Sequence, residues 1–334
     1  MDEARALVRR WVDEGLLPGG VLAVRGPRGE QYAEAFGSVR MDTLFDLASL
    51  TKVVATLPVV LSLIASGKLS LDDPVCRYVP DFRHRKVTIR HLLSHSSGLP
   101  ADLPWQPRHA ADRDVRGDIL AQPLLFEPGS RALYSDLGMI LLGWIAETAA
   151  EDRLDRLARR LVFEPLGMAE TMFRPPVSLA ERIAPTETVD GVTIRGEVHD
   201  EKCFHLGGIC GSAGLFSTAA DVTKYADWWL DRLPVEGLDI PPELMDACIR
   251  PIAGNRGLGW ELWTGIGDPP SCGGRWSIGS FGHTGFTGTS LWIDPASRCF
   301  AVFLTNAIHF GRGNRIRELR PVLHSVIYSS FHGD

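Results

Sequence analysis

The sequence predicts an α+β protein, in which an antiparallel sheet flanked by terminal helices is interrupted by an inserted helical lobe. Strand patterns occur near both ends of the 334-residue chain, whereas helical patterns dominate its middle. Helical patterns also open and close the chain. We therefore expect residues 1–68 and 201–334 to form one discontinuous sheet lobe and residues 69–200 to form a mainly helical lobe.

The first elements are a helix and a hairpin. Apolar residues recur with a period of 3.6 from Ala6 to Leu16, and Pro18-Gly19-Gly20 ends this helix. Residues 21–24 and 32–36 flank a turn rich in glycine and proline, which predicts two paired strands. Residues 50–66 are apolar nearly all round, as in a helix buried between layers.

The remaining elements follow a long middle region rich in proline, arginine and short helical runs such as residues 137–150. Strand patterns resume at residues 260–264, 276–286, 289–293 and 300–305, the last two joined by Asp294-Pro295. A final helix is expected over residues 315–331.

Charge and composition exclude some classes of partner. Charged residues make up 23% of the chain and the net charge is −6, so no broad cationic surface is available for nucleic acid. The longest uncharged apolar run, between Lys52 and Lys68, is shorter than the roughly 20 residues that a membrane span needs. Acidic residues at the N-terminus argue against a secretory signal, and the six scattered cysteines suggest reduced thiols. We expect a cytoplasmic protein with no membrane partner.

The strongest chemical candidate is Ser49, which precedes Lys52 by three residues where the buried helix begins. This spacing places the hydroxyl and the amine on one helix face, as a nucleophile with a cation beside it. On this pattern alone, an ordinary helix N-cap is the commoner role for a serine such as Ser49.

Two further motifs, Tyr134-Ser135-Asp136 and His283-Thr284-Gly285, follow in order. Together with Ser49-Leu50-Thr51-Lys52, they resemble the signature of serine β-lactamases and penicillin-binding proteins. The likeness is greatest to the branch of class C β-lactamases, D-alanyl-D-alanine carboxypeptidases and related esterases. Residues 92–99, 127–129, 165–168 and 214–218 are similar to the same family, so the resemblance spans nearly the whole chain.

The resemblance implies a β-lactamase/transpeptidase-like fold, with the active site between the two lobes, and a set of roles. Ser49 would be the nucleophile, Lys52 its electrostatic partner, and Tyr134 the group that exchanges protons with Ser49 and the leaving group. Which of Lys52 and Tyr134 acts as the base stays open. The substrate-binding and oxyanion set would comprise Asp136, His283, Thr284, Gly285 and Phe286, with the Ser49 and Phe286 N–H groups forming the oxyanion hole.

Two residues depart from the better-known enzymes. Asp136 replaces an asparagine and, when ionised, only accepts hydrogen bonds. It could pair with Lys52 and keep it protonated, or it could simply cap the helix that starts at Leu137. His283 replaces a lysine; with an ordinary pKa near 6.5 it would gain charge only on acidification, which weakens the case for β-lactam hydrolysis.

No cofactor or metal is expected. His199, Asp200, Cys203 and His205 cluster in the sequence without a standard zinc spacing, and no G-x-S-x-G motif of an α/β-hydrolase is present. The sequence therefore predicts a serine hydrolase that cleaves an amide or ester of a small molecule, such as a peptide, a muropeptide, an ester or a β-lactam. The alternatives are a promiscuous carboxylesterase, a true class C-like β-lactamase, and a penicillin-binding sensor that deacylates slowly.

Overall fold

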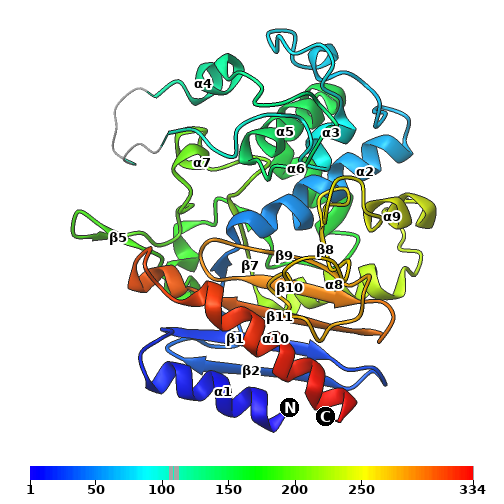
Figure 1. Ribbon diagram of the computed structural model, residues 1–334. Helices are drawn as coiled ribbons and strands as arrows, with labels where there is room; N and C mark the ends of the chain where they lie inside the picture. Colours follow the sequence, from blue (N-terminus) through cyan, green and yellow to red (C-terminus); the bar gives the residue numbers. More distant parts are fainter. Residues whose placement is uncertain (105–107, 109–112, 334) are drawn as a thin grey trace.

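The computed structural model describes residues 1–104, 108 and 113–333 and shows helices on both faces of a central sheet (Figure 1). The strands are β1 (Gly19–Arg25), β2 (Gln31–Gly37), β3 (Phe45–Asp46), β4 (Met172–Phe173), β5 (Thr188–Val189), β6 (Val192–Thr193), β7 (Leu215–Ser217), β8 (Glu261–Leu262), β9 (Phe281–Thr284), β10 (Ser290–Asp294) and β11 (Cys299–Thr305). The α-helices are α1 (Asp2–Asp13), α2 (Leu57–Ala65), α3 (Ile89–Leu93), α4 (Val115–Ala121), α5 (Asp136–Ala150), α6 (Leu154–Ala158), α7 (Glu201–His205), α8 (Ala219–Asp231), α9 (Pro242–Cys248) and α10 (Ile316–His332).

The central sheet joins both ends of the chain. Its six strands run in the order β2-β1-β11-β10-β9-β8, and every neighbouring pair is antiparallel. Gly20 pairs with Thr305 where the first strand meets the last. The α+β class is confirmed, as is the hairpin of β1 and β2, and both termini lie at the same side of the sheet (Figure 1).

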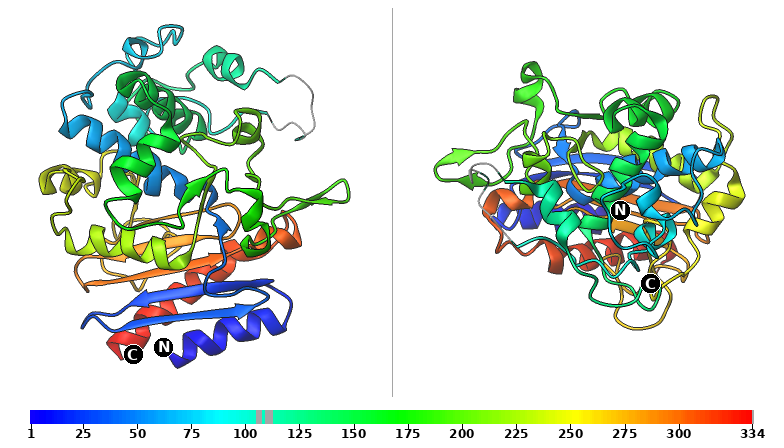
Figure 2. Two further views of the ribbon diagram at one scale, coloured as in Figure 1. Left: turned by 180° about the vertical axis from the view of Figure 1, so that it is seen from behind. Right: turned by 90° about the horizontal axis from the view of Figure 1, so that it is seen from above.

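Each face of the sheet contributes alternate residues to a separate apolar core, as the period of two in a strand requires. Leu22 and Val24 of β1 pack with α1 and α10. Val21 and Ala23, on the opposite face, join the larger core that includes α8 and extends into the helices of the middle region. The view from behind shows α8 lying along the sheet on the side away from α1 (Figure 2).

The segment after Ser49 is helical, as expected, but its geometry changes along its length. A 3₁₀ turn, η1 (Ala48–Leu50), leads into a π-helical stretch, η2 (Lys52–Thr56), and then into α2. Residues Ala48–Ala65 are apolar enough, by length and composition, to cross a membrane, yet 78% of them are buried inside the protein. Their apolar surface therefore belongs to the core, between the sheet and α5.

The strands predicted at residues 260–264 and 276–286 are shorter than expected. They form only β8 and β9, because residues 276–280 make a turn in which Gly279 takes a positive φ of 95°. Trp276 is nevertheless buried, and its indole N–H donates to the carbonyl oxygen of His324 at 2.9 Å. The aromatic residue that contributed to the predicted strand pattern therefore packs against α10 instead.

Candidate active site

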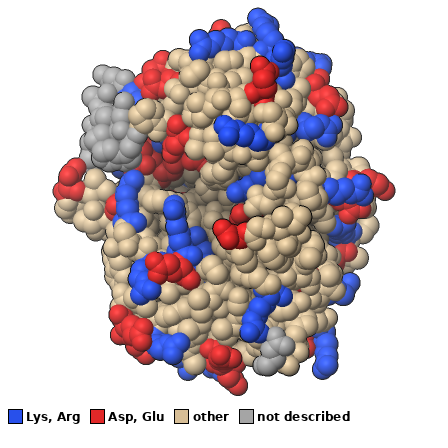
Figure 3. Space-filling view, in the orientation of Figure 1, with Lys and Arg blue, Asp and Glu red and all other residues tan. Residues whose placement is uncertain are grey.

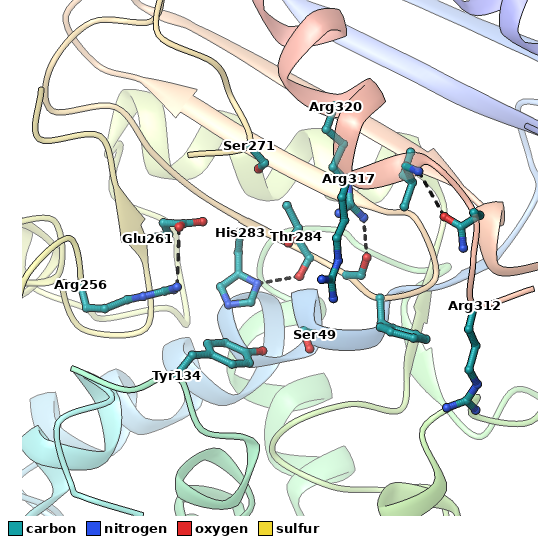
Figure 4. A pocket seen from close by; sticks show the side chains of 14 residues that line it. Ser49, Tyr134, Arg256, Glu261, Ser271, His283, Thr284, Arg312, Arg317 and Arg320 are labelled. Atoms are coloured by element: carbon teal, nitrogen blue, oxygen red, sulfur yellow. Dashed lines mark hydrogen bonds and ion pairs between the residues drawn. The ribbon is translucent and has the colours of Figure 1, made fainter. Parts of the chain in front are cut away.

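A cavity of about 830 Å³ opens where η1, the end of β9 and the start of α10 meet. The hollow is visible in the space-filling view, with basic side chains at its rim (Figure 3). Its lining residues are Ser49, Tyr134, Arg256, Glu261, Ser271, His283, Thr284, Gly285, Phe286, Arg312, Asn314, Ile316, Arg317 and Arg320. The structure therefore brings parts of all three sequence motifs to one cavity (Figure 4).

Ser49 reaches this cavity through a sharp turn. Ala48 has a positive φ of 46°, which is uncommon for a residue with a side chain, and its N–H donates to the Asp46 carboxylate at 2.9 Å. The next turn begins as the Leu50 N–H donates to the Leu47 carbonyl. This geometry leaves the Ser49 side chain at the mouth of the helix, partly exposed to the cavity.

Lys52 is fully buried and lies among polar partners. Its Nζ lies 2.8 Å from Ser49 Oγ, from the Ser212 carbonyl oxygen and from Asp136 Oδ1. Burial alone would lower the pKa of Lys52, but the Asp136 carboxylate and Tyr134 outweigh it and raise the pKa above its ordinary value. Lys52 therefore remains a cation that donates a hydrogen bond to Ser49.

Asp136 is the partner of Lys52 and not the cap of α5. The Ser135 hydroxyl accepts from the Gly138 N–H and caps the helix, which leaves the Asp136 carboxylate free to turn inward. Burial would raise the pKa of Asp136, but Lys52 and then Lys202 outweigh it and lower the pKa. Of the two readings of the sequence, the ion pair is correct.

The substrate contact expected of Asp136 is not supported, because this residue stands behind Lys52 and does not line the cavity. Its second oxygen lies 3.4 Å from the buried Lys202, a residue that the sequence did not single out. Lys202 is held in turn by Asp102 at 2.8 Å and Asp200 at 3.1 Å. Two buried lysines thus share three carboxylates beside Ser49.

Tyr134 lies between two cations. Lys52 Nζ and the Arg256 guanidinium are each 5.3 Å from the centre of its ring, while its hydroxyl interacts with Lys52 and Ser49. Burial raises the pKa of Tyr134, and Lys52 offsets only part of that rise. The phenol therefore keeps its proton at neutral pH.

His95 holds the Tyr134 loop in place. Burial, followed by the charge of Arg256, lowers the pKa of His95, so that its Nδ1 can accept the Ser135 N–H at 3.1 Å. The His95 carbonyl accepts the Leu133 N–H at 2.8 Å. The sequence placed His95 within a block of family likeness, but nothing there indicated contact with Tyr134, whose ring is 4.7 Å away.

His283 lines the cavity as expected, but its expected titration near pH 6.5 is wrong. The side chain is 4% exposed, and burial, followed by the charges of Lys52 and Arg256, lowers its pKa to about 3. Its Nδ1–H donates to the Thr284 carbonyl at 2.8 Å. His283 is therefore neutral in the physiological range and cannot attract an anion by gaining charge.

Gly285 begins the tight turn that follows β9. A Cβ at this position would lie 2.1 Å from Thr289 Oγ1 and 2.4 Å from the Leu47 carbonyl oxygen, so only glycine fits. The turn is docked on the segment before Ser49, because Thr289 Oγ1 donates to the same Leu47 carbonyl at 3.0 Å. Within the described part of the chain, the Phe286 N–H has no hydrogen-bond acceptor.

Four arginines of the cavity were missed by the sequence analysis. Arg317 and Arg320 belong to the predicted last helix, whose pattern does not reveal which residues face a cavity, and Arg256 and Arg312 lie outside the helices. Arg256 lies 3.6 Å from Glu261, and Arg312 pairs with Glu187 and Glu201. Arg317 extends from α10 toward Ser49 (Figure 4), and it forms no ion pair with any residue that the structure describes. The cavity is therefore cationic.

Three of the four residues considered for a metal have other partners. His199 Nε2 lies 2.9 Å from the Glu187 carboxylate, Asp200 caps α7, and the Cys203 thiol points to the Ala213 carbonyl. Among residues 1–104, 108 and 113–333, no group of three His, Cys, Asp or Glu side chains is placed to hold a metal ion.

Comparison with known proteins identifies the family. The family model described as Beta-lactamase matches residues 4–322. A protein of Escherichia coli (strain K12) named "Putative D-alanyl-D-alanine carboxypeptidase" is 35% identical over 314 residues, covering 80% of this chain and 70% of that protein.

Solved structures agree at the level of the fold. Simvastatin synthase from Aspergillus terreus superposes with a TM-score of 0.77 at 21% identity, covering 100% of this chain and 99% of that one. A class C beta-lactamase superposes with a TM-score of 0.79 at 21% identity, covering 100% and 96%. On the family match over nearly its whole length and on this 35% identity, the chain belongs to the beta-lactamase family and is a serine hydrolase.

Proposed function

We propose that Ser49 attacks the carbonyl carbon of a small amide or ester and is acylated. The observation that carries this proposal is the 2.8 Å hydrogen bond from Lys52 to Ser49 Oγ, with Lys52 held as a cation by Asp136. A hydroxyl that accepts a hydrogen bond from an ammonium gains stabilisation as its oxygen becomes negative. Lys52 is thus the electrostatic partner of the nucleophile and not its base.

Tyr134 then carries the proton. Because Lys52 donates to Ser49 Oγ, the hydrogen of Ser49 is left to point to the neighbouring Tyr134 hydroxyl. Tyr134 accepts this proton while passing its own to the leaving group, so the phenol is neutral before and after the step. Such a shuttle needs no free base and fits the raised pKa of Tyr134. In deacylation, water takes the place of the leaving group and the protons move in reverse.

The developing oxyanion is received by backbone N–H groups. Phe286, whose N–H has no acceptor within the described residues, lines the same cavity as Ser49. The hydrogen bond between Thr289 and Leu47 fixes the Gly285 turn to the segment that leads into Ser49. Preorganised dipoles of this kind supply a large part of the rate in acyl transfer.

The substrate carries a negative charge near the scissile bond, because Arg317 projects into the cavity with no ion-pair partner among the described residues. A peptide with a free terminal carboxylate meets this requirement, and the E. coli relative bears the name of a carboxypeptidase. A small peptide or muropeptide is therefore the substrate class we propose, with simple esters and β-lactams as further acyl donors.

The acyl-enzyme is the direct test. Brief incubation with p-nitrophenyl butyrate, penicillin or a peptide ending in D-alanyl-D-alanine, followed by acid quenching, should leave one acyl group on the intact protein by mass spectrometry. Peptide mapping should place it on Ser49. Rapid loss of the group from peptide or ester indicates a hydrolase, whereas an adduct that persists for hours indicates a sensor. Label on any other residue, or none from any donor, contradicts the proposal.

Arg317→Gln should weaken the preference for anionic substrates. We expect kcat/KM for a carboxylate-bearing ester to fall about 3- to 10-fold, since a partly exposed ion pair contributes on the order of 1 kcal/mol, and a neutral ester of the same size to change less than about 2-fold. Arg315→Gln is the matched control, because Arg315 pairs with Glu318 on the same helix and does not line the cavity. Equal losses for both esters would exclude charge recognition by Arg317.

A further inference from the structure

Arg320 is a buried cation with no carboxylate partner among the described residues. Its side chain is 5% exposed, and no ion pair involves it. Instead, its Nη2 donates to two backbone carbonyls, Gly285 O at 2.5 Å and Thr289 O at 3.0 Å. Burial, and then the charge of Arg317, lowers the pKa of Arg320 to about 9. Burying an unpaired guanidinium is unfavourable, so a structural or functional reason is needed.

The position of Gly285 O suggests the reason. This carbonyl and the Phe286 N–H belong to the same peptide unit, which is planar and trans. In a trans peptide the C=O and the N–H point in opposite directions, so the group that holds the oxygen also fixes the direction of the N–H. A donor on the carbonyl also polarises the unit and makes its N–H a stronger donor.

The second carbonyl bonded by Arg320 lies at the other end of the same turn. Thr289 O also accepts the Gly285 N–H at 2.7 Å, which closes the turn between β9 and β10. One guanidinium nitrogen therefore joins both ends of the turn that carries Phe286 and anchors them to α10.

We propose that Arg320 is the positioning residue of the oxyanion site, holding the Gly285–Phe286 peptide unit so that its N–H faces the carbonyl oxygen of the substrate. This rests on the function proposed above, in which Ser49 is acylated. Arg320 acts through the peptide and need not touch the substrate, unlike Arg317, which extends into the cavity three residues earlier on α10.

Kinetics of Arg320→Met and Arg320→Gln test this role. Methionine has no donor, so kcat for a neutral p-nitrophenyl ester should fall about 10- to 100-fold, while KM changes less than about 2-fold. This loss is smaller than the roughly 10²- to 10³-fold that follows outright removal of an oxyanion donor, because the Phe286 N–H is still present. Glutamine can still donate to one carbonyl and should lose less. Anionic and neutral esters should be affected equally, which distinguishes Arg320 from a residue that binds a substrate carboxylate.

A boronic acid provides the second readout, because it forms a tetrahedral adduct with an active-site serine and places an oxygen in the oxyanion site. Inhibition of Arg320→Met by phenylboronic acid should weaken by the same factor as kcat. Arg315→Gln, at the exposed N-cap position of the same helix, should change neither quantity. Thermal unfolding of each variant checks that the fold persists. If Arg320→Met does not fold, the same measurements are made on Arg320→Gln and Arg320→Lys.

The outcomes separate the two proposals. Wild-type kcat and wild-type boronate affinity in every folded Arg320 variant would overturn the role of Arg320 while leaving acylation of Ser49 intact. A loss confined to anionic esters would also overturn it, since it would make Arg320 a substrate-binding residue. Absence of any acyl group on Ser49 in the wild-type protein would instead overturn the proposed function.

Discussion

Ser49→Ala should abolish hydrolysis of esters and peptides, with kcat/KM falling by at least about 10⁴-fold, because no second hydroxyl can take over nucleophilic attack at this position. Hydrolysis of p-nitrophenyl butyrate under pre-steady-state and steady-state conditions measures the loss. The residual rate reflects only water attacking a substrate held in the oxyanion site.

The fold should survive this change. Ser49 lies at the edge of the cavity, and its removal costs one hydrogen bond from Lys52, about 1 kcal/mol. Lys52 keeps its hydrogen bond to the Ser212 carbonyl and its ion pair with Asp136. Circular dichroism and the melting temperature serve as controls. A folded Ser49→Ala protein that turns over the ester at the wild-type rate would remove Ser49 from the mechanism.

Tyr134→Phe should lower kcat by about 10²- to 10⁴-fold, the usual contribution of a positioned proton-transfer group. The ring should keep its place, because Lys52, Arg256 and His95 all lie against the ring itself, which the substitution leaves unchanged. Substrate binding should therefore change little, so KM is expected to stay within a few-fold of the wild-type value.

The matched control is Tyr78→Phe. The Tyr78 hydroxyl donates to the Asp73 carboxylate at 2.7 Å, and the residue is not part of the cavity, so the same atom is removed without touching the site. Its activity should stay within about 2-fold of wild type, since only a local hydrogen bond is lost. If both tyrosine variants hydrolyse the ester equally well, Tyr134 transfers no proton in the slow step.

Much of the fold could be predicted because its signals are local. β1 and β11 are nearly continuous apolar runs, as expected of strands that are buried on both faces, and the helical period of α10 is plain in the sequence. Ser49, Lys52 and Tyr134 could be proposed from motif order alone, and the structure places them together.

The rest depends on tertiary packing. Asp136 at the start of a helix is compatible with a cap or an ion pair, and only the position of Ser135 decides between them. The charge of His283 follows from its burial, which its neighbours in sequence do not determine. Arg317 and Arg320 share one helix and both line the cavity, yet Arg317 is exposed and Arg320 is buried against a turn.

The union of β1 with β11 has a consequence for how the protein is made. During synthesis, the hairpin of β1 and β2 leaves the ribosome long before β11 has been made. Until then the β1 edge of the hairpin has no partner strand and is prone to aggregation. Contacts of such high sequence separation also slow folding. Ser49 emerges early, whereas the turn after β9 and its anchor on α10 emerge last. A growing chain should therefore remain unreactive toward acyl donors until almost the whole polypeptide has been released.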